Sequence, residues 1–281
     1  MQSNKRWFVG MDGGGTKTTA ALCDEVGQVA AVVTGGASNM MARARNEVAE
    51  VLRELYERVL DEAGVRETDV ERIVLGLAGA DRPEVKEAVL SSFYLHGAGV
   101  RIQVDNDAIC ALHAGTWGEP GIVLIAGTGS IAYGVNRFGE RFRTGGWGYL
   151  LGDEGSGYDL GRRAVSAVLH AFDGRGPETQ LTEELLRMFR VNRPDEIISL
   201  VYNSSHQRAA LAGVSRVLGK VVKAGDPVAQ ELVAGAVESL ADMVKALEKR
   251  MGKGYPVVLA GGLFSSDSWF LEWAQPVLAQ R

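Results

Sequence analysis

The chain has 281 residues, of which 46% are hydrophobic and 23% charged, with a formal net charge of −5. This length and composition allow a large buried core in one large or two medium domains. The acidic balance without a basic run argues against nucleic acid as a partner, and the strand-sized apolar stretches argue against a membrane span. The apolar run before Asp12 is too short for a signal peptide, so we expect a cytoplasmic protein.

The first stretch with a chemical signature is residues 7–22, WFVGMDGGGTKTTAAL. It predicts an apolar strand ending at Asp12, a tight glycine turn and a second strand. Glycine lets backbone N–H groups approach a phosphate, and the Asp12 carboxylate can hold a hydrated Mg²⁺. An ordinary hairpin turn explains the same residues equally well. The candidate phosphate contacts are Gly13, Gly14, Gly15, Thr16, Lys17 and Thr18.

The spacing differs from two common phosphate loops. A P-loop needs glycine immediately before its lysine and a helix after it, whereas Thr16 precedes Lys17 and β-branched residues follow. A dinucleotide fingerprint needs its third glycine where this chain has Thr18. The turn therefore predicts a strand–turn–strand phosphate site.

The next elements predict an α/β domain. Two further strands fill residues 18–36, and a helical apolar period extends over 41–63. Asn39, just before that helix, is either a capping residue or a ligand contact. A strand at 72–80 and a helix at 84–92 follow, and continuous apolar strands alternating with helices indicate parallel pairing.

The strand that starts near Val100 ends in Asp105, Asn106 and Asp107. Ligands of open α/β sheets bind outside the carboxyl ends of the strands, so we expect Asp12, Gly79 and Asp107 to converge there. Asp107 is also well placed to cap a helix over 108–114, and the two roles are compatible.

Residues 122–148, IVLIAGTGSIAYGVNRFGERFRTGGWG, repeat the layout of the first strands. Both stretches contain an apolar strand, a Gly/Thr turn, a second strand, a turn with glycine, a third strand and a closing Thr-Gly-Gly. This self-similarity predicts a duplicated fold in which two glycine turns face each other across a cleft.

The remaining sequence predicts a helical region and one more strand. Residues 152–156, GDEGS, place carboxylates at the start of a helix, where they serve the helix dipole or present oxygens to a sugar. A final strand meets Gly261 and Gly262, and a last helix follows. The helices between are expected at about 179–190, 194–203, 205–224 and 226–251.

Two cysteines, Cys23 and Cys110, lie far apart in apolar contexts. We expect both to be buried reduced thiols. Neither these cysteines nor the four histidines have metal-ligand spacing, which disfavours a zinc site.

The order of these motifs resembles the BadF/BadG/BcrA/BcrD ATPase family, and within it the N-acetylglucosamine kinases. The resemblance covers nearly the whole chain. It implies an α/β, duplicated ribonuclease H-like (actin-like ATPase) fold, with two domains at 1–117 and 118–281 around a nucleotide and sugar cleft. The motifs are Asp12 to Thr18, Asp105 to Ala108, Gly127 to Ser130, Gly152 to Ser156 and Ala260 to Gly262.

The resemblance also implies roles for individual residues. The first turn would be the first phosphate motif, with Asp12 near Mg²⁺, and Asp107 would be the catalytic base. Gly127, Thr128 and Gly129 would form the second phosphate motif, and Gly261 with Gly262 the adenosine motif. The sugar contacts would be Asn39, Asp107, Gly152 and Asp153.

The chain departs from the family pattern at two places. Kinases of this type often carry Asn after the Gly-Thr-Gly-Ser run, where this chain has Ile131, so the acetamido contact is unassigned. The sequence also ends soon after the adenosine motif, where relatives of this type add a strand and a helix.

The resemblance and the chemistry of phosphoryl transfer together favour an ATP- and Mg²⁺-dependent kinase acting on the 6-hydroxyl of an amino sugar, first of all N-acetylglucosamine. Glucosamine, N-acetylmuramic acid and N-acetylmannosamine remain candidate substrates. A reductase-activating ATPase with an iron–sulfur cluster shared by a dimer, and a non-catalytic sugar sensor, are the alternatives from other classes. Relatives are often homodimers, so a homodimer is expected.

Overall fold

The structure is a computed structural model, and it describes residues 5–14, 17–38, 44–80, 83–92, 101–204, 206–265 and 268–280. The chain divides into two compact units, Met1–Ala114 and Gly115–Arg281. Each unit has its own mixed sheet and its own hydrophobic core. The two units are described separately below.

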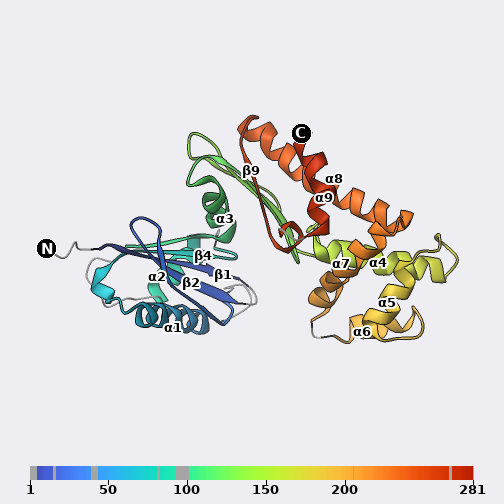
Figure 1. The fold of residues 1–281 in the computed structure, drawn as a ribbon, viewed down its shortest axis with the longest axis horizontal. Coiled ribbons are helices and arrows are strands. Elements are labelled where there is room, and N and C mark those ends of the chain that lie inside the picture. The colour runs from blue at the N-terminus through green and yellow to red at the C-terminus, as the bar shows by residue number, and fades with distance from the viewer. Residues whose placement is uncertain are drawn as a thin grey trace. The chain divides into compact units, whose positions relative to one another are not determined.

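The first unit is a five-stranded sheet with α1 and α2 on one face and α3 on the other (Figure 1). The strand order is β3-β2-β1-β4-β5, with β1, β2 and β3 antiparallel and β1, β4 and β5 parallel. Its elements are β1 (Trp7–Gly13), β2 (Thr18–Asp24), β3 (Val29–Gly35), α1 (Arg45–Ala63), a 3₁₀ turn (Glu67–Asp69), β4 (Val70–Leu77), α2 (Pro83–Ser92), β5 (Arg101–Asn106) and α3 (Asp107–Thr116).

Helix α1 covers the sheet because its apolar side chains recur every three or four residues. Val48, Leu52, Leu55 and Val59 are all at most 1% exposed and pack in one cluster with the buried side chains of the strands. The helix ends where Gly64, at φ 65°, donates its N–H to the carbonyl of Asp61.

The second unit combines a four-stranded sheet with a helical layer (Figure 1). Helix α8 packs against the first three strands of this sheet, and helices α4 and α7 pack against each other. The elements are β6 (Gly121–Ala126), β7 (Ser130–Val135), β8 (Arg141–Gly145), α4 (Gly157–Phe172), α5 (Leu181–Phe189), α6 (Glu196–Tyr202), α7 (Gln207–Lys223), α8 (Pro227–Met251), β9 (Val257–Ala260), a 3₁₀ turn (Gly262–Phe264) and α9 (Trp269–Ala279).

The predicted internal repeat is confirmed by the sheet topology. The order β8-β7-β6-β9 of the second unit matches the order β3-β2-β1-β4 of the first. In both, three antiparallel strands are joined by a parallel strand that comes later in the chain. Gly14, after β1, and the Gly-Thr-Gly segment, after β6, therefore occupy equivalent positions.

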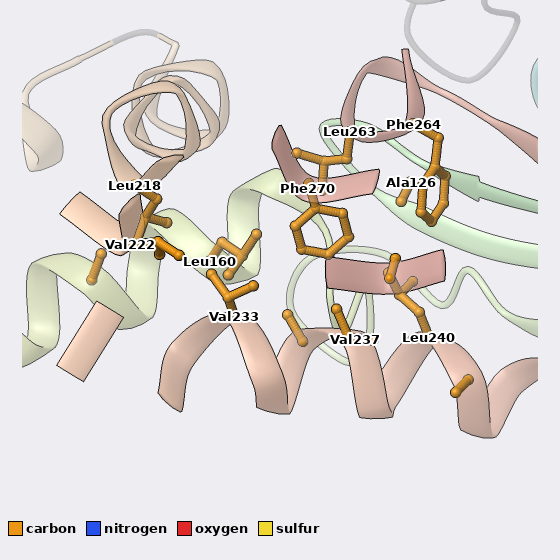
Figure 2. Close-up of a cluster of buried hydrophobic side chains, with 14 of the residues drawn as sticks. Ala126, Leu160, Leu218, Val222, Val233, Val237, Leu240, Leu263, Phe264 and Phe270 are labelled. Carbon is orange, nitrogen blue, oxygen red and sulfur yellow. The ribbon is translucent and has the colours of Figure 1, made fainter. Parts of the chain in front are cut away.

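The core of the second unit joins helices to the end of the sheet (Figure 2). Phe270 from α9 is fully buried among side chains of the sheet end, the final 3₁₀ turn and α8, including Ala126, Leu263 and Val237. Phe264 and Phe270 lie with ring centroids 5.9 Å apart. This packing fixes the chain on both sides of Gly261 and Gly262.

The cysteines are less buried than predicted. Cys23 and Cys110 are both free, as expected, but each is only half-buried. Cys23 lies on a strand whose alternate residues are buried, and Cys110 packs from α3 against Gly76 of β4. In the described ranges, no helix is long and apolar enough to cross a lipid bilayer.

Candidate functional site

The first glycine turn is closed by main-chain hydrogen bonds. Gly14 donates to the carbonyl of Lys17 at 3.0 Å, and the N–H of Ser38 donates to the carbonyl of Gly14 at 3.1 Å. A Cβ on Gly13 would lie 2.1 Å from Oγ of Ser38 and 2.5 Å from Cδ2 of Leu77, so any larger residue at this position would force both side chains to shift. Lys17 is exposed, whereas Thr18 is fully buried and donates its hydroxyl proton to Ser38 at 2.8 Å.

Strand register brings the predicted acidic residues to one edge of the first sheet. Asp12 of β1 is paired with Gly76 of β4, and Gly76 is paired with Asp105 of β5. The N–H of Ala78, just after β4, donates to the carbonyl of Gly13 at 2.9 Å. The carboxyl ends of these three parallel strands therefore lie together, and Asp107 follows directly on the third.

Asp107 is the first residue of α3 and is half-buried. The N–H of Ala108 is accepted by Oδ1 of Asn106 at 2.8 Å and by Oδ1 of Asp107 at 2.9 Å. The sequence predicted Asp107 as the cap of this helix. In the structure Asn106 and Asp107 both accept the N–H of Ala108, so they share the capping contact. Asp105 is buried, with Oδ1 3.5 Å from Nζ of Lys86 on α2.

The second glycine turn is bound to the start of α4. Gly127 donates its N–H to the carbonyl of Gly129 at 2.9 Å, and its own carbonyl accepts the N–H of Gly157 at 2.7 Å. Among the described residues, the N–H groups of Thr128 and Gly129 have no acceptor. Two such N–H groups beside a helix N-terminus form an arrangement that suits an anion.

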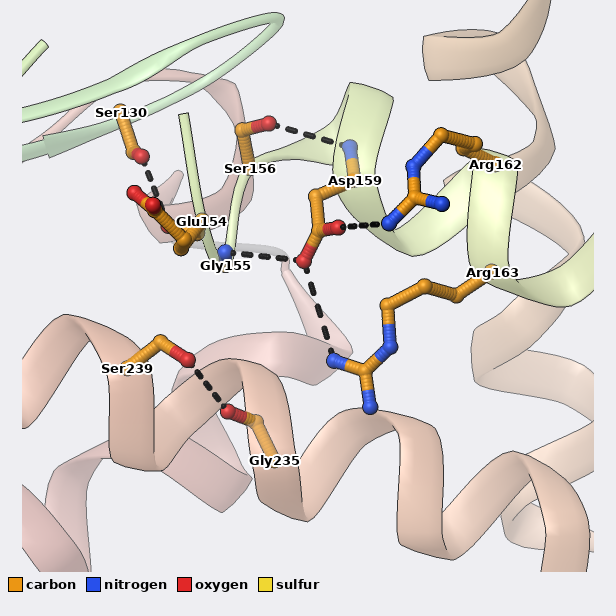
Figure 3. Close-up of polar contacts among 9 residues, drawn as sticks. All are labelled: Ser130, Glu154, Gly155, Ser156, Asp159, Arg162, Arg163, Gly235 and Ser239. Carbon is orange, nitrogen blue, oxygen red and sulfur yellow. Dashed lines mark hydrogen bonds and ion pairs between the residues drawn. The ribbon is translucent and has the colours of Figure 1, made fainter. Parts of the chain in front are cut away.

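The loop before α4 is ordered by a network centred on Asp159 (Figure 3). Ser156 caps the helix by accepting the N–H of Asp159 at 3.1 Å, and the carboxylate of Asp159 accepts the N–H of Gly155 at 3.2 Å. Arg162 and Arg163 approach the same carboxylate at 3.1 and 3.7 Å. This loop is therefore a rigid support rather than a free turn.

Asp153 connects this loop to the second glycine turn. It is 3% exposed and has a positive φ of 62°. Its Oδ1 accepts the N–H of Ser130 at 3.4 Å, and its Oδ2 is 2.9 Å from Nη2 of Arg208 on α7. Burial raises the pKa of the Asp153 carboxyl, and the Ser130 hydrogen bond and the Arg208 charge oppose this rise only in part.

A cavity of about 570 Å³ opens beside the second glycine turn. Gly127 and Thr128 line it at one side and Gly262 at another, so two motifs that are about 130 positions apart share one cavity. Gly261 has a φ of 93°, and a Cβ there would lie 2.4 Å from the carbonyl oxygen of Ala126. The remaining lining residues are Gly157, Ala209, Ala212, Gly213, Ser215, Arg216, Leu263, Ser265, Ser268 and Trp269.

Helix α7 contributes cavity residues that the sequence motifs did not identify. Its lining face is made of small residues, including Ala209, Ala212 and Gly213. Trp269 lies against α7 where Gly219 leaves room, since a Cβ on Gly219 would be 2.4 Å from the indole ring. The sequence signal for this lining was the run of small residues AALAG at 209–213, because small side chains on a helix let a ligand or another segment come close to its backbone.

Asp12 is suited to a weakly held, hydrated cation. Its side chain is exposed at the end of β1. In the ranges that the structure describes, no group of three His, Cys, Asp or Glu side chains could hold a metal. A Mg²⁺ ion that keeps most of its water and binds phosphate oxygens needs only one or two carboxylates, so the residues present fit it.

Three predicted contacts, Gly15, Thr16 and Asn39, lie outside the described residues. Gly152 lies beside Asp153, and its N–H donates to the carbonyl of Gly148 at 2.8 Å. In the first unit the structure brings Asp12 and Gly13 to the strand edge that Asp107 follows. In the second unit it brings Gly127 and Thr128 to the same cavity as Gly262, with Asp153 behind the glycine turn.

A family profile and two relatives each match most of this chain. The sequence profile of the BadF/BadG/BcrA/BcrD ATPase family matches residues 9–274. The N-acetylmuramic acid/N-acetylglucosamine kinase of Clostridium acetobutylicum is 34% identical over 95% of this chain and 88% of that protein. The N-acetyl-D-glucosamine kinase of Dictyostelium discoideum is 36% identical over 92% of this chain and 86% of that protein.

Solved structures confirm the predicted fold class. A protein of Chromobacterium violaceum, provisionally named an N-acetylglucosamine kinase, superposes with a TM-score of 0.80 at 29% identity, covering 99% of this chain and 94% of that one. The ROK hexokinase of Thermus thermophilus, at 21% identity, shares the fold with a TM-score of 0.57 over 98% of this chain and 88% of its own.

Proposed function

We propose that this chain, which belongs to the BadF/BadG/BcrA/BcrD ATPase family, is an ATP-dependent amino-sugar kinase that transfers the γ-phosphate to the 6-hydroxyl of N-acetylglucosamine. The observation that carries the proposal is the cavity of about 570 Å³ shared by Gly127, Thr128 and Gly262. The names of the Clostridium and Dictyostelium relatives support the substrate class.

The second unit is proposed to bind the nucleotide. The adenosine part would occupy the cavity beside Gly261, Gly262 and the small residues of α7. The phosphate tail would then follow Gly127, Thr128 and Gly129, where two N–H groups have no acceptor among the described residues. Backbone N–H groups at a helix start are suited to phosphate because the donors are fixed and the helix dipole favours negative charge.

The first unit is proposed to supply the remaining phosphate contacts. Gly13, Gly14 and Lys17, together with residues 15 and 16, would contact the terminal phosphates. A Mg²⁺ ion, when bound near Asp12, would offset charge on the phosphate oxygens. The exposed Lys17 ammonium can bond those oxygens as well, whereas buried Thr18 shapes the turn through its bond to Ser38.

Asp107 is proposed as the general base. Its carboxylate would accept the proton of the sugar hydroxyl as that oxygen attacks the γ-phosphorus, an effect typically worth about 10²–10⁴ in rate. Its position at the start of α3 fixes the carboxylate at the edge of the sheet. The other proposed sugar contacts are Asn39, Gly152 and Asp153.

Other substrates and chemistries are distinguished by one set of assays. N-acetylmuramic acid and glucosamine are the main alternative substrates, because two relatives of this chain are named as kinases of these sugars. A reductase-activating ATPase is not favoured, because Cys110 packs against Gly76 and Cys23 lies on a strand. The expected homodimer would be measured by light scattering coupled to size exclusion.

The test is ADP release with ATP, Mg²⁺ and a panel of hexoses and amino sugars. We expect turnover with N-acetylglucosamine and much lower kcat/KM with glucose. Equal ADP release with and without each sugar would contradict a kinase, and a preference for N-acetylmuramic acid or glucosamine would reassign the substrate. Iron content and visible absorption of the purified protein would reveal the reductase-activating alternative.

A further inference from the structure

Arg208, at the start of α7, is held against the second glycine turn. Its Nη2 is 2.9 Å from Oδ2 of Asp153, and the same nitrogen is 2.6 Å from the position that a Cβ on Gly129 would take. The guanidinium also lies over the ring of Tyr149, with Cζ 5.6 Å from the centroid. A buried carboxylate, a glycine backbone and an aromatic ring thus fix one cation beside the turn.

The guanidinium retains hydrogen-bonding capacity in this position. Asp153 occupies Nη2, and in the described part of the chain Nε and Nη1 have no hydrogen-bond partner. The Arg208 side chain is 45% exposed, whereas that of Asp153 is 5% exposed. The ion pair therefore leaves Nε and Nη1 of Arg208 on an accessible side chain, open to a ligand.

The next residue on α7 connects this cation to the cavity. Ala209 lines the same cavity as Gly127 and Thr128. A phosphate tail that leaves the cavity along the glycine turn passes the N–H groups of Thr128 and Gly129, and Arg208 lies against Gly129. Guanidinium pairs well with phosphate because it presents several donors in one plane.

We propose that Arg208 is a nucleotide-binding residue that contacts the phosphate tail of ATP and ADP beside Gly129, where its ion pair with Asp153 holds it. This proposal rests on the function proposed above, because it requires that the cavity bind a nucleotide. It adds a side-chain cation to the backbone donors of the turn.

A purely structural ion pair predicts different behaviour. If Arg208 only attached α7 to the glycine turn, its loss would disturb the cavity and weaken every ligand that binds there, with or without phosphate. If it contacts phosphate, its loss weakens ligands in proportion to their phosphate charge. Adenosine and ADP differ only in phosphate and therefore separate the two roles.

The experiment is calorimetric titration of the full chain with ADP and with adenosine, for the wild type and four variants. Arg208→Ala removes the cation. Arg208→Gln removes the charge but keeps an amide donor for Asp153, so it tests the charge even if the alanine variant folds poorly. Arg208→Lys keeps the charge. Arg193→Ala is the matched control, because it removes an equally charged, paired arginine on the surface.

We expect Arg208→Ala and Arg208→Gln to weaken ADP binding at least tenfold and adenosine binding less than twofold. Arg208→Lys should recover part of the ADP affinity, and Arg193→Ala should match the wild type. Equal losses for ADP and adenosine, or no loss in the glutamine variant, would overturn the proposal while leaving the kinase function standing. A wild type that binds no ADP would overturn both.

Discussion

The two glycine turns share one sheet topology, yet different chemistry supports them. The first turn is held by a hydroxyl pair and by apolar packing, through Ser38, Thr18 and Leu77. The second is held by the start of α4 and by the buried Asp153, which pairs with Arg208. Duplication preserved the backbone layout, while the side chains around each copy diverged.

From this difference we expect the two units to contribute different steps, nucleotide binding in the second unit and phosphoryl transfer in the first. The second unit contains the cavity shared by Gly127, Thr128 and Gly262, beside a turn in which two N–H groups have no acceptor in the described ranges. The first unit has, at one strand edge, exposed Asp12 and half-buried Asp107, whose carboxylates can hold a hydrated cation and accept a proton. We therefore expect variants in the second unit to alter nucleotide affinity, and variants in the first unit to alter transfer.

The largest effect is expected for Asp107→Asn in the first unit. Loss of the general base should lower kcat by about 10²–10⁴, while ADP affinity stays within twofold of the wild type. The measurement is steady-state turnover together with calorimetric ADP binding. Asp242→Asn, an exposed acid on α8, is the control and should retain full activity. Normal turnover by the Asp107 variant would show that the base lies elsewhere.

A smaller but clear effect is expected for Gly261→Ala in the second unit. The substitution forces a side chain to φ 93° and brings its Cβ within 2.4 Å of the carbonyl oxygen of Ala126. The free energy of unfolding should therefore fall by about 1–3 kcal/mol. Gly262→Ala is the matched control, since nothing lies within 4 Å of its Cβ position. Urea unfolding measures both, and equal stabilities would contradict the packing described for this turn.

Gly13→Ala tests the corresponding turn of the first unit. Its Cβ would meet Ser38 and Leu77, side chains that can shift, so the cost should be about 1–3 kcal/mol, typical of overpacking. Gly10→Ala in the same strand has open space and should change the unfolding free energy little. A Gly13 variant as stable as the Gly10 variant would show that this turn is not constrained by its neighbours.

The smallest effects are opposite pH dependences of two buried carboxylates. The hydrogen bond from Lys5, aided by the N–H groups of Gln28 and Val26, lowers the pKa of Asp24 below its ordinary 3.8. The stability that Asp24 contributes is therefore present above pH 3.8 and is lost as pH falls through its lowered pKa. The raised pKa of Asp153 has the opposite sign, so its contribution is present in acid and is lost as pH rises.

Melting temperatures of Asp24→Asn and Asp153→Asn across the acidic and neutral range measure this contrast. The Asp24 variant should be less stable than the wild type at neutral pH, with a deficit that shrinks in acid. For the Asp153 variant, the melting temperature relative to the wild type should move in the variant's favour as pH rises from about 4 to 7. Parallel curves for the two variants would contradict the assigned shifts.

Local patterns predicted much of the fold. The glycine repeat predicted two equivalent sheets, and the family predicted from the ordered motifs is confirmed. Helical periods located α5 to α8 within about three residues, because amphipathic faces are encoded locally. The capping contact at the start of α3 was less predictable, since Asn106 and Asp107 both reach the same N–H.

Contacts between distant segments were not predictable from one sequence. Asp153 and Arg208 are separated by 55 positions, and nothing in either local pattern indicates that they pair. The same holds for Gly219, which provides the space for Trp269. Such contacts depend on how α7 packs in the tertiary structure, whereas turns and periods depend only on neighbours in sequence.

The most direct test of an amino-sugar kinase is phosphorus NMR of the products formed from ATP, Mg²⁺ and N-acetylglucosamine. The account predicts a new phosphomonoester signal, coupled to the protons on carbon 6 of the sugar, that grows in equal amount with ADP. Release of inorganic phosphate alone, at one rate with and without each amino sugar, would contradict it.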